Sequence, residues 1–361
     1  MAAELGVGVV GVGWAGTQHV GCFVKNPHCR VVGLCGRNPD RVRSNLAGAG
    51  LSLPDTYVTD DYSRLVNDPD IQLIAIATPN DRHAAEAVAA ARAGKHLLIE
   101  KPVGMNEEEL ARILDAVEAS QVRTIVSFEL RFNPYLRFLR WLRERGSLGE
   151  VRFARLQYLS HVTDWYAGWE WLRTREGGGS HLVAAGCHAV DALRWLTGWE
   201  PEQVSAFHTG FTEGYEWPTT ILANMVCPGG GLAHVTSSTD FMMPYTFGIE
   251  LMGDGLTVRD GLLLWSGDAP DPEQLLDGFE GPVTLEPATY GENPALRIVA
   301  DMPDSVDVSH HPFQDEADEL VAAIIEGRDT VIDVRDAART MRLCFAADAS
   351  AEAGGGPITL A

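Results

Sequence analysis

The sequence predicts an α/β protein in which a doubly wound parallel sheet precedes a larger, mostly antiparallel sheet. Two observations lead to this fold class. Short β-branched runs alternate with helical segments over about the first 125 residues, as parallel strands joined by crossover helices do. Longer strand-like runs separated by glycine turns follow residue 130, as in an antiparallel sheet with one solvated face. We therefore expect two domains, residues 1–128 and 129–361.

The first domain is expected to alternate strands with helices. Asn106 precedes three glutamates, which places a cap and acidic side chains where a helix start favours them. The expected strands are 7–11, 30–35, 71–77, 95–100 and 123–129, and the expected helices are 15–25, 39–48, 81–93 and 106–119.

The second domain is expected to combine long strands with amphipathic helices. Residues 133–145 and 187–198 carry apolar side chains at three- and four-residue intervals, the spacing of one helix face. Two further helices are expected in the tail, within 310–327 and 334–354. His310 and His311 read as a cap of these tail helices, and no histidine spacing indicates a metal site.

Composition narrows the class of partner. The 361 residues, 45% of them hydrophobic, suffice for a substantial core. Fifty acidic residues against 28 Lys and Arg give a formal net charge of −22, which argues against nucleic acid or an anionic membrane as a partner. A small molecule is therefore expected. Six scattered cysteines, no basic leader and no long apolar run favour a cytoplasmic protein.

A dinucleotide site is indicated by Gly11-x-Gly13-x-x-Gly16, directly after the first expected strand. Glycines permit the tight turn and the approach of a pyrophosphate, and the helix that follows stabilises the anion at its N-terminus. An ordinary glycine turn can match the same pattern, but the surrounding strand–helix units favour the cofactor. The expected contacts from this turn are Gly11, Gly13, Trp14, Ala15 and Gly16.

The end of the second expected strand indicates NADP, with NAD as the alternative cofactor. An NAD enzyme usually carries an acid about 20 residues past the glycines, whereas here Gly36 stands beside Arg37, with Arg41 a turn later. Guanidinium groups match phosphate oxygens, so a 2′-phosphate suits this site. Alternatively, Arg37 stacks on adenine or points to water.

Several motifs in order give the chain a family resemblance. They are the glycine turn, Thr78-Pro79-Asn80 with His83, Glu100-Lys101-Pro102, RFNPYLR at 131–137, GGG at 177–179 and GCHAVDALRWL at 186–196. With them the sequence resembles the Gfo/Idh/MocA family of NAD(P)-dependent oxidoreductases over essentially its whole length. The resemblance implies a Rossmann domain and a second domain with a large open sheet, whose outer face often mediates oligomers. We therefore expect a homodimer or homotetramer.

The resemblance also implies roles for the motif residues. Thr78, Pro79, Asn80, His83, Glu100 and Lys101 are expected to contact the cofactor. Lys101 is expected to hydrogen-bond the reacting oxygen and stabilise charge on it, across an X-Pro bond that is commonly cis in this family. The alternative for Lys101 is an ion pair with Glu100 at the strand end.

His188 is the expected proton acceptor. Oxidising a secondary alcohol needs a base of near-neutral pKa beside the hydroxyl, which suits imidazole. Asp191, one turn on, is expected to bind a substrate hydroxyl or orient the ring. Ala184 departs from the family, in which many members carry Asp four residues before this histidine. His188 then works with Lys101 alone, or His181 or Asp191 substitutes, or catalysis is lost; glycines around His181 argue against a helix that would put it on the face of His188.

The substrate is expected to be a sugar. The segment 160–179 contains several tryptophans, Tyr166 and hydrogen-bonding side chains. This combination suits a sugar ring, whose faces are apolar and whose rim carries hydroxyl groups. The alternative is that the tryptophans form an interface or a lid. The expected substrate contacts are Asp191, Arg131, His161, Trp171 and Arg173, and Asn133 borders them.

The resulting expectation is an NAD(P)-dependent dehydrogenase or reductase acting on a secondary alcohol or ketone of a sugar, polyol, cyclitol or glycoside. Two alternatives remain: a non-catalytic cofactor-binding sensor, and a glycosidase that uses bound NAD in a redox cycle.

Overall fold

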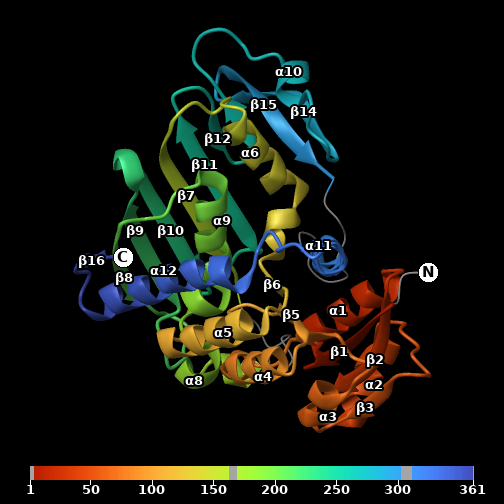
Figure 1. The fold of residues 1–361 in the computed structure, drawn as a ribbon. Coiled ribbons are helices and arrows are strands. Elements are labelled where there is room, and N and C mark those ends of the chain that lie inside the picture. The colour runs from red at the N-terminus through yellow and green to blue at the C-terminus, as the bar shows by residue number, and fades with distance from the viewer. Residues whose placement is uncertain (1–3, 162–168, 302–310, 361) are drawn as a thin grey trace. The chain divides into compact units, whose positions relative to one another are not determined.

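The computed structural model describes residues 4–161, 169–301 and 311–360. These residues form two compact units, coloured along the chain in Figure 1. The first unit holds the described residues of 4–129, 169–179 and 313–342, and the second holds those of 130–161, 180–312 and 343–360. The expected fold class is confirmed, because a parallel sheet lies in the first unit and a mostly antiparallel one in the second. The domain division at residue 128 stays a prediction.

The first unit is built on a six-stranded sheet whose strands all run parallel, in the order β3-β2-β1-β4-β5-β6. This order reverses at β1 and β4, which is the point where doubly wound sheets bind ligands. The strands are β1 Leu5–Val10, β2 Cys29–Cys35, β3 Tyr57–Thr59, β4 Leu73–Ile76, β5 His96–Ile99 and β6 Thr124–Val126.

α1, α2, α4 and α5 agree with the expected helices to within one residue, whereas α7 and α8 were not predicted. The sequence prediction missed β3 and the helix after it, because both are short and carry little periodic signal. The helices are α1 Trp14–Lys25, α2 Pro39–Gly48, α3 Tyr62–Asn67, α4 Asn80–Arg92, α5 Glu107–Ser120, α7 Trp169–Leu172, α8 Arg175–Gly178 and α11 Phe313–Glu326.

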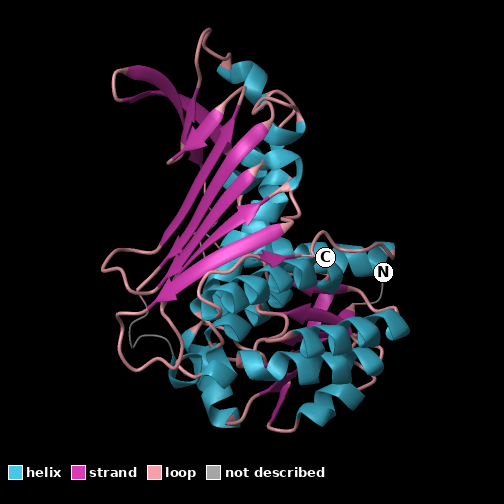
Figure 2. Ribbon diagram, turned by 90° about the vertical axis from the view of Figure 1, so that its left-hand side faces the viewer, coloured by secondary structure: helices cyan, strands magenta, loops and turns pink. Residues whose placement is uncertain are grey.

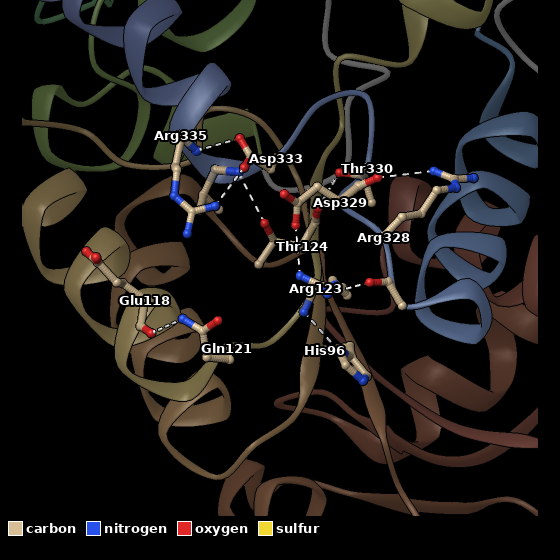
Figure 3. A network of polar contacts seen from close by, with 12 residues as sticks. His96, Glu118, Gln121, Arg123, Thr124, Arg328, Asp329, Thr330, Asp333 and Arg335 are labelled. Carbon is tan, nitrogen blue, oxygen red and sulfur yellow. Dashed lines mark hydrogen bonds and ion pairs between the residues drawn. The ribbon is translucent and has the colours of Figure 1, made fainter.

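A segment near the end of the chain completes this unit. The backbone N–H of Val126 in β6 donates to the carbonyl of Ile332, and the Thr330 hydroxyl donates to the carbonyl of Thr124. Arg123 adds an ion pair to Asp329, and its backbone N–H donates to His96 Nδ1 (Figure 3). Residues more than 200 positions apart thus close the β6 edge of the sheet.

The second unit is built on a ten-stranded sheet in the order β14-β15-β13-β12-β11-β7-β10-β9-β8-β16. All neighbours are antiparallel except β7 and β10, which run parallel. The strands are β7 Val151–Leu159, β8 Gln203–Thr209, β9 Thr220–Val226, β10 Leu232–Ser238, β11 Thr246–Gly253, β12 Thr257–Arg259, β13 Leu262–Leu264, β14 Val283–Tyr290, β15 Asn293–Ala300 and β16 Ile358–Thr359.

One face of this sheet carries helices, among them α6 and α9, whereas the other lies open in Figure 2. On the open face Phe207, Leu222, Val226 and Leu232 form cross-strand pairs and are all exposed. The helical elements are η1 Glu129–Phe132, α6 Pro134–Glu144, the π-helical turn η2 Leu182–Gly186, α9 Cys187–Thr197, η3 Pro228–Gly230 and α10 Pro272–Leu276, with α12 Val334–Glu352 continuing from the first unit.

No helix in the described part of the chain combines the length and the apolar character needed to cross a bilayer. The cytoplasmic location stays a prediction.

Candidate functional site

The three glycines of the first turn serve different purposes. Gly11 has a φ of +83°, and a Cβ there would lie 2.3 Å from the carbonyl oxygen of Ala77. A Cβ at Gly16 would lie 2.2 Å from the carbonyl oxygen of Gly11, so this glycine lets α1 pack closely. A Cβ at Gly13 would meet none of the described atoms within 4 Å. Packing therefore requires Gly11 and Gly16, whereas the space at Gly13 fits a ligand.

The start of α1 suits an anion. Gly13 precedes the helix without a side-chain cap, and the first turn holds no acidic residue, as is typical of a helix N-terminus that binds an anion. Trp14 packs edge-on against Phe313 of α11, with ring centroids 5.8 Å apart. The residues present thus fit the pyrophosphate of a dinucleotide.

Substitution by alanine is expected to separate the two kinds of glycine. Gly16→Ala should destabilise the fold by roughly 1–3 kcal/mol, because the methyl group overlaps the Gly11 carbonyl. Gly13→Ala should leave unfolding unchanged but weaken dinucleotide binding by about tenfold or more, because the methyl group takes the space of a phosphate. Urea unfolding and cofactor titration measure the two effects. Loss of stability in Gly13→Ala would contradict this division.

Arg37 lies in the loop after β2, and Arg41 lies in the first turn of α2. Both side chains are exposed, and neither guanidinium forms a hydrogen bond or ion pair with another described residue. Asn38 lies between them and caps α2 by accepting from the N–H groups of Asp40 and Arg41. The cap fixes the backbone while leaving both guanidinium groups available to a phosphate.

The loops that follow β4 and β5 are joined by His83. Its Nε2 lies 2.8 Å from the carbonyl oxygen of Thr78, and its Nδ1 lies 2.8 Å from that of Pro102. The Thr78 hydroxyl donates to Glu86, and Asn80 Nδ2 lies 3.5 Å from the Gly178 carbonyl oxygen. Both His83 and Asn80 are buried, so their contacts hold the loops at this edge of the sheet in place.

Lys101 directly follows the buried carboxyl of Glu100. His19 Nε2 of α1 lies 2.9 Å from Glu100 Oε1. Burial alone would raise the pKa of Glu100, but the hydrogen bond and charge of His19 and the nearby Lys101 lower it on balance. Glu100 is therefore a carboxylate that favours the ammonium form of its neighbour. The Lys101–Pro102 bond is cis, as the resemblance implied.

A second buried carboxyl, Glu316 of α11, belongs to the same region of the first unit. Burial raises its pKa well above the usual value, and the charges of Glu129 and Glu100 raise it further. The Ser127 hydroxyl lies 2.8 Å from Glu316 Oε2. Glu316 therefore favours its neutral form, which spares Glu100 a like charge.

In the second unit, His188 lies near the start of α9 and is 2% exposed. Its ring stacks on Tyr158 of β7, with centroids 5.8 Å apart and planes 13° from parallel. The His311 ring meets His188 edge-on at 6.1 Å and tilts towards Tyr245 at 6.2 Å. Aromatic rings and imidazoles therefore surround the expected base.

The expectation that glycines prevent a helix around His181 is wrong. The segment is helical, and η2 is a π-turn in which an extra residue widens the helix. A Cβ at Gly186 would lie 2.2 Å from Ser237 Oγ, so this glycine permits close packing on β10. His181 Nδ1 lies 2.7 Å from Ser237 Oγ, and its ring lies 6.1 Å from that of Tyr158. His181 and His188 thus flank the same tyrosine.

Asp191 forms a buried ion pair with Arg131 of η1. Arg131 Nε donates to Asp191 Oδ2 at 2.7 Å and Nη2 donates to Oδ1 at 2.5 Å, with both side chains almost fully buried. A bidentate pair of this kind fixes both side chains. Asn133 caps α6 by accepting from the N–H of Tyr135. The Arg131–Asp191 pair thus ties η1 to α9, the helix that carries His188.

The remaining predicted substrate residues divide between the units. His161 belongs to the second unit and is half-buried, whereas Trp171 and Arg173, also half-buried, belong to the first. Trp165 and Tyr166 lie outside the described residues.

Four residues near the two histidines were not predicted: Tyr158, Trp217, Tyr245 and His311. Trp217 stacks on His181 at 6.1 Å. Alternation along 151–159 places Tyr158 on the same face as buried Ala154 and Leu156, a signal that was available in the sequence. His311 was interpreted as a helix cap, and nothing local links it to His188.

Comparison with protein-family models gives two matches. The model of the oxidoreductase family with an NAD-binding Rossmann fold matches residues 5–128. The model of the GFO/IDH/MocA C-terminal domain matches residues 136–259.

Similar proteins include two curated relatives. Levoglucosan dehydrogenase of Pseudarthrobacter phenanthrenivorans is 35% identical over 146 residues, covering 39% of this chain and 36% of that protein. Mouse trans-1,2-dihydrobenzene-1,2-diol dehydrogenase is 29% identical over 202 residues, covering 54% and 56%. The match thus spans just over a third of the first relative and just over half of the second. A solved levoglucosan dehydrogenase in complex with NADH and levoglucosan has a TM-score of 0.80 at 21% identity, covering 99% of both chains, which shows the shared fold.

Proposed function

Because this chain belongs to the Gfo/Idh/MocA family of oxidoreductases, we propose that it is an NAD(P)-dependent dehydrogenase of a sugar, polyol, cyclitol or glycoside. The observation that carries the proposal is the pairing of a glycine turn that leaves room for a phosphate with a lysine beside a buried carboxylate at the ligand-binding edge of the sheet. Both curated relatives named above carry the name of a dehydrogenase, which supports the reaction class.

Lys101 binds and polarises the reacting oxygen of the substrate. The buried Glu100 carboxylate keeps the lysine charged, and the charged ammonium stabilises negative charge as the hydroxyl loses its proton. The glycine turn and the loops after β4 and β5 would hold a nicotinamide dinucleotide, which would supply hydride acceptor or donor chemistry for the carbinol carbon.

His188 accepts the proton of that hydroxyl. Its parallel stack on Tyr158 and the edge-on ring of His311 hold the imidazole plane in one orientation. The Arg131–Asp191 ion pair supports α9 one turn further on. The side chain of Ala184 carries no oxygen, and Asp191 is paired with Arg131, so His181 and Tyr158 are the candidates we propose for a second polar group.

NADP is the proposed cofactor, with NAD as the competitor. Arg37→Ala should weaken NADP binding by about 10–100-fold, the equivalent of roughly 1.5–3 kcal/mol for a hydrogen bond to a charged group, and leave NAD binding unchanged. Titration of the wild type and variant with both dinucleotides measures this. Arg30→Ala, at the opposite end of β2, is the matched control. Equal losses for both dinucleotides would instead indicate stacking on adenine.

A substrate panel tests the function. The purified chain is incubated with NAD or NADP and with sugars, polyols, cyclitols and glycosides, while the absorbance of the reduced cofactor is followed in both directions. Turnover of at least one alcohol that is lost in His188→Asn is expected. Cofactor binding without turnover of any compound would contradict the proposal and favour a sensor.

A homo-oligomer that buries the open sheet face is also proposed. The cross-strand pairs Phe207 with Leu222 and Leu232 with Val226 form an exposed apolar surface, which is typical of an interaction site. Leu222→Glu should lower the mass measured by light scattering, and an unchanged mass would contradict the proposed interface.

A further inference from the structure

A continuous series of ring contacts leads away from His188 within the second unit. Tyr158 stacks on His188, and its ring also lies 6.1 Å from that of His181. His181 stacks on Trp217 at 6.1 Å, and Trp217 meets Tyr215 edge-on at 4.7 Å. These five residues, which we call the aromatic row, all belong to the second unit.

The aromatic row runs across the sheet. Tyr158 lies on β7, whereas Trp217 and Tyr215 lie in the loop of residues 210–219, which joins β8 to β9. Because β10 separates β9 from β7, two strand spacings, roughly 10 Å, lie between Tyr158 and the nearer strand of this loop. A sugar ring that stacks on Tyr158 beside His188 therefore leaves Tyr215 for another group.

Asp240, just past the end of β10, holds this loop at both of its ends. Its Oδ1 accepts from the backbone N–H of Thr212 at 2.9 Å, from the hydroxyl of the same residue at 2.6 Å and from the Thr219 hydroxyl at 2.6 Å. Its Oδ2 accepts from the Thr220 hydroxyl at 2.5 Å. Burial alone would raise the pKa of Asp240, but these hydrogen bonds lower it on balance, so the group is a carboxylate. The loop is thus fixed before a ligand binds, which lowers the entropy lost on binding.

The outer end of the aromatic row suits a ring with an apolar face. Trp217 is buried, whereas Tyr215 is half-buried, so part of this tyrosine contacts solvent. Glu213 and Glu216 beside it are exposed, and carboxylates accept hydrogen bonds from hydroxyl groups. A partly exposed aromatic ring beside hydrogen-bond acceptors is typical of a site for such a ring.

We propose that Tyr215 and Trp217 form a second subsite, which binds a ring attached to the reacting sugar, so that the substrate is a glycoside rather than a free monosaccharide. Tyr215 stacks on the attached ring, and Trp217 supports Tyr215 from the buried side. The proposal rests on the proposed function, because it takes His188 as the place of reaction. The attached ring is a second sugar or an aromatic aglycone, which both present an apolar face, and the test below separates them.

Kinetics with matched glycosides test the subsite. The wild type is compared on the methyl, phenyl and glucosyl glycosides of the compound that the panel identifies. At least one of the two ring-bearing glycosides is expected to have a KM about three- to tenfold below that of the methyl glycoside, the size of one ring contact. A low KM for the phenyl compound alone would assign an aromatic aglycone, and a low KM for the glucosyl compound would assign a second sugar. Equal KM values for all three compounds would overturn the proposal.

Variants of the loop locate the effect. Tyr215→Ala should raise KM for the preferred ring-bearing glycoside by about three- to tenfold and change KM for the methyl glycoside less, whereas Tyr215→Phe keeps the ring and should retain the preference. Asp240→Asn should act as Tyr215→Ala does, because it weakens the hydrogen bonds that fix the loop. Tyr290→Ala, at an exposed tyrosine on β14 of the same unit, is the matched control with unchanged kinetics. If Tyr215→Ala impaired all three glycosides equally, its role would be structural and the proposal would be wrong.

The subsite and the proposed function fail separately. If the wild type oxidised no alcohol, the proposed function would fall, and calorimetric titration with phenyl and methyl β-D-glucoside would decide whether the subsite binds a ring. Tighter binding of the phenyl compound that is lost in Tyr215→Ala would support the subsite, and equal binding would overturn it. If the wild type turned over all three glycosides with one KM, the function would stand and the subsite would not.

Discussion

Lys101→Met is expected to lower kcat by about 10²–10³-fold while the chain still binds the cofactor. The reason is that the ammonium stabilises charge on the substrate oxygen in the transition state, and removing one such group usually costs this much. Steady-state kinetics with the substrate found in the panel, together with cofactor titration, measure both quantities.

Lys25→Met is the matched control for this substitution. Lys25 is exposed in the last turn of α1, so its loss removes a lysine without touching the strand ends. Its kcat should equal that of the wild type. If Lys101→Met kept wild-type kcat, the lysine would be structural, as in the alternative of an ion pair with Glu100.

His188→Asn is expected to lower kcat by about 10²–10⁴-fold, the usual contribution of a general base. The pH dependence of kcat/KM provides a second test of this role. A base must be unprotonated to accept the proton, so kcat/KM for oxidation should rise with pH in the wild type through the ionisation of His188, and this rise should vanish in the variant.

His208→Asn on β8 is the matched control, because it makes the same substitution in the second unit at a half-buried ring. It should keep the wild-type rate and pH profile. A His188→Asn variant with the same acidic limb as the wild type would assign the proton transfer to another group, for which His181 and His311 are candidates.

Local signals in the sequence predicted most of the first unit. The β-branched runs locate β1, β2, β4, β5 and β6, because a strand buried on both faces is apolar throughout. Asn106 predicted the start of α5, and its side chain accepts from the N–H of Glu109 as a cap does. The short β3 and α3 have too few residues to show a period.

The environment of the site depends on contacts that no local pattern carries. Arg131 and Asp191 are 60 positions apart, and His311 reaches His188 from far along the chain. The π-turn before α9 was also not predicted, since Gly186 reads as a helix breaker until its packing against Ser237 is seen. Sequence motifs therefore predicted which residues carry the chemistry, and the fold shows which contacts hold those residues in place.

We propose that Lys101 and His188 serve one reacting hydroxyl. A double-mutant cycle in kcat/KM with Lys101→Met and His188→Asn tests it most directly. Groups that act as a unit are strongly non-additive, so the double variant should be little slower than the slower single variant. If the two losses multiplied instead, the residues would act independently and the claim would be wrong.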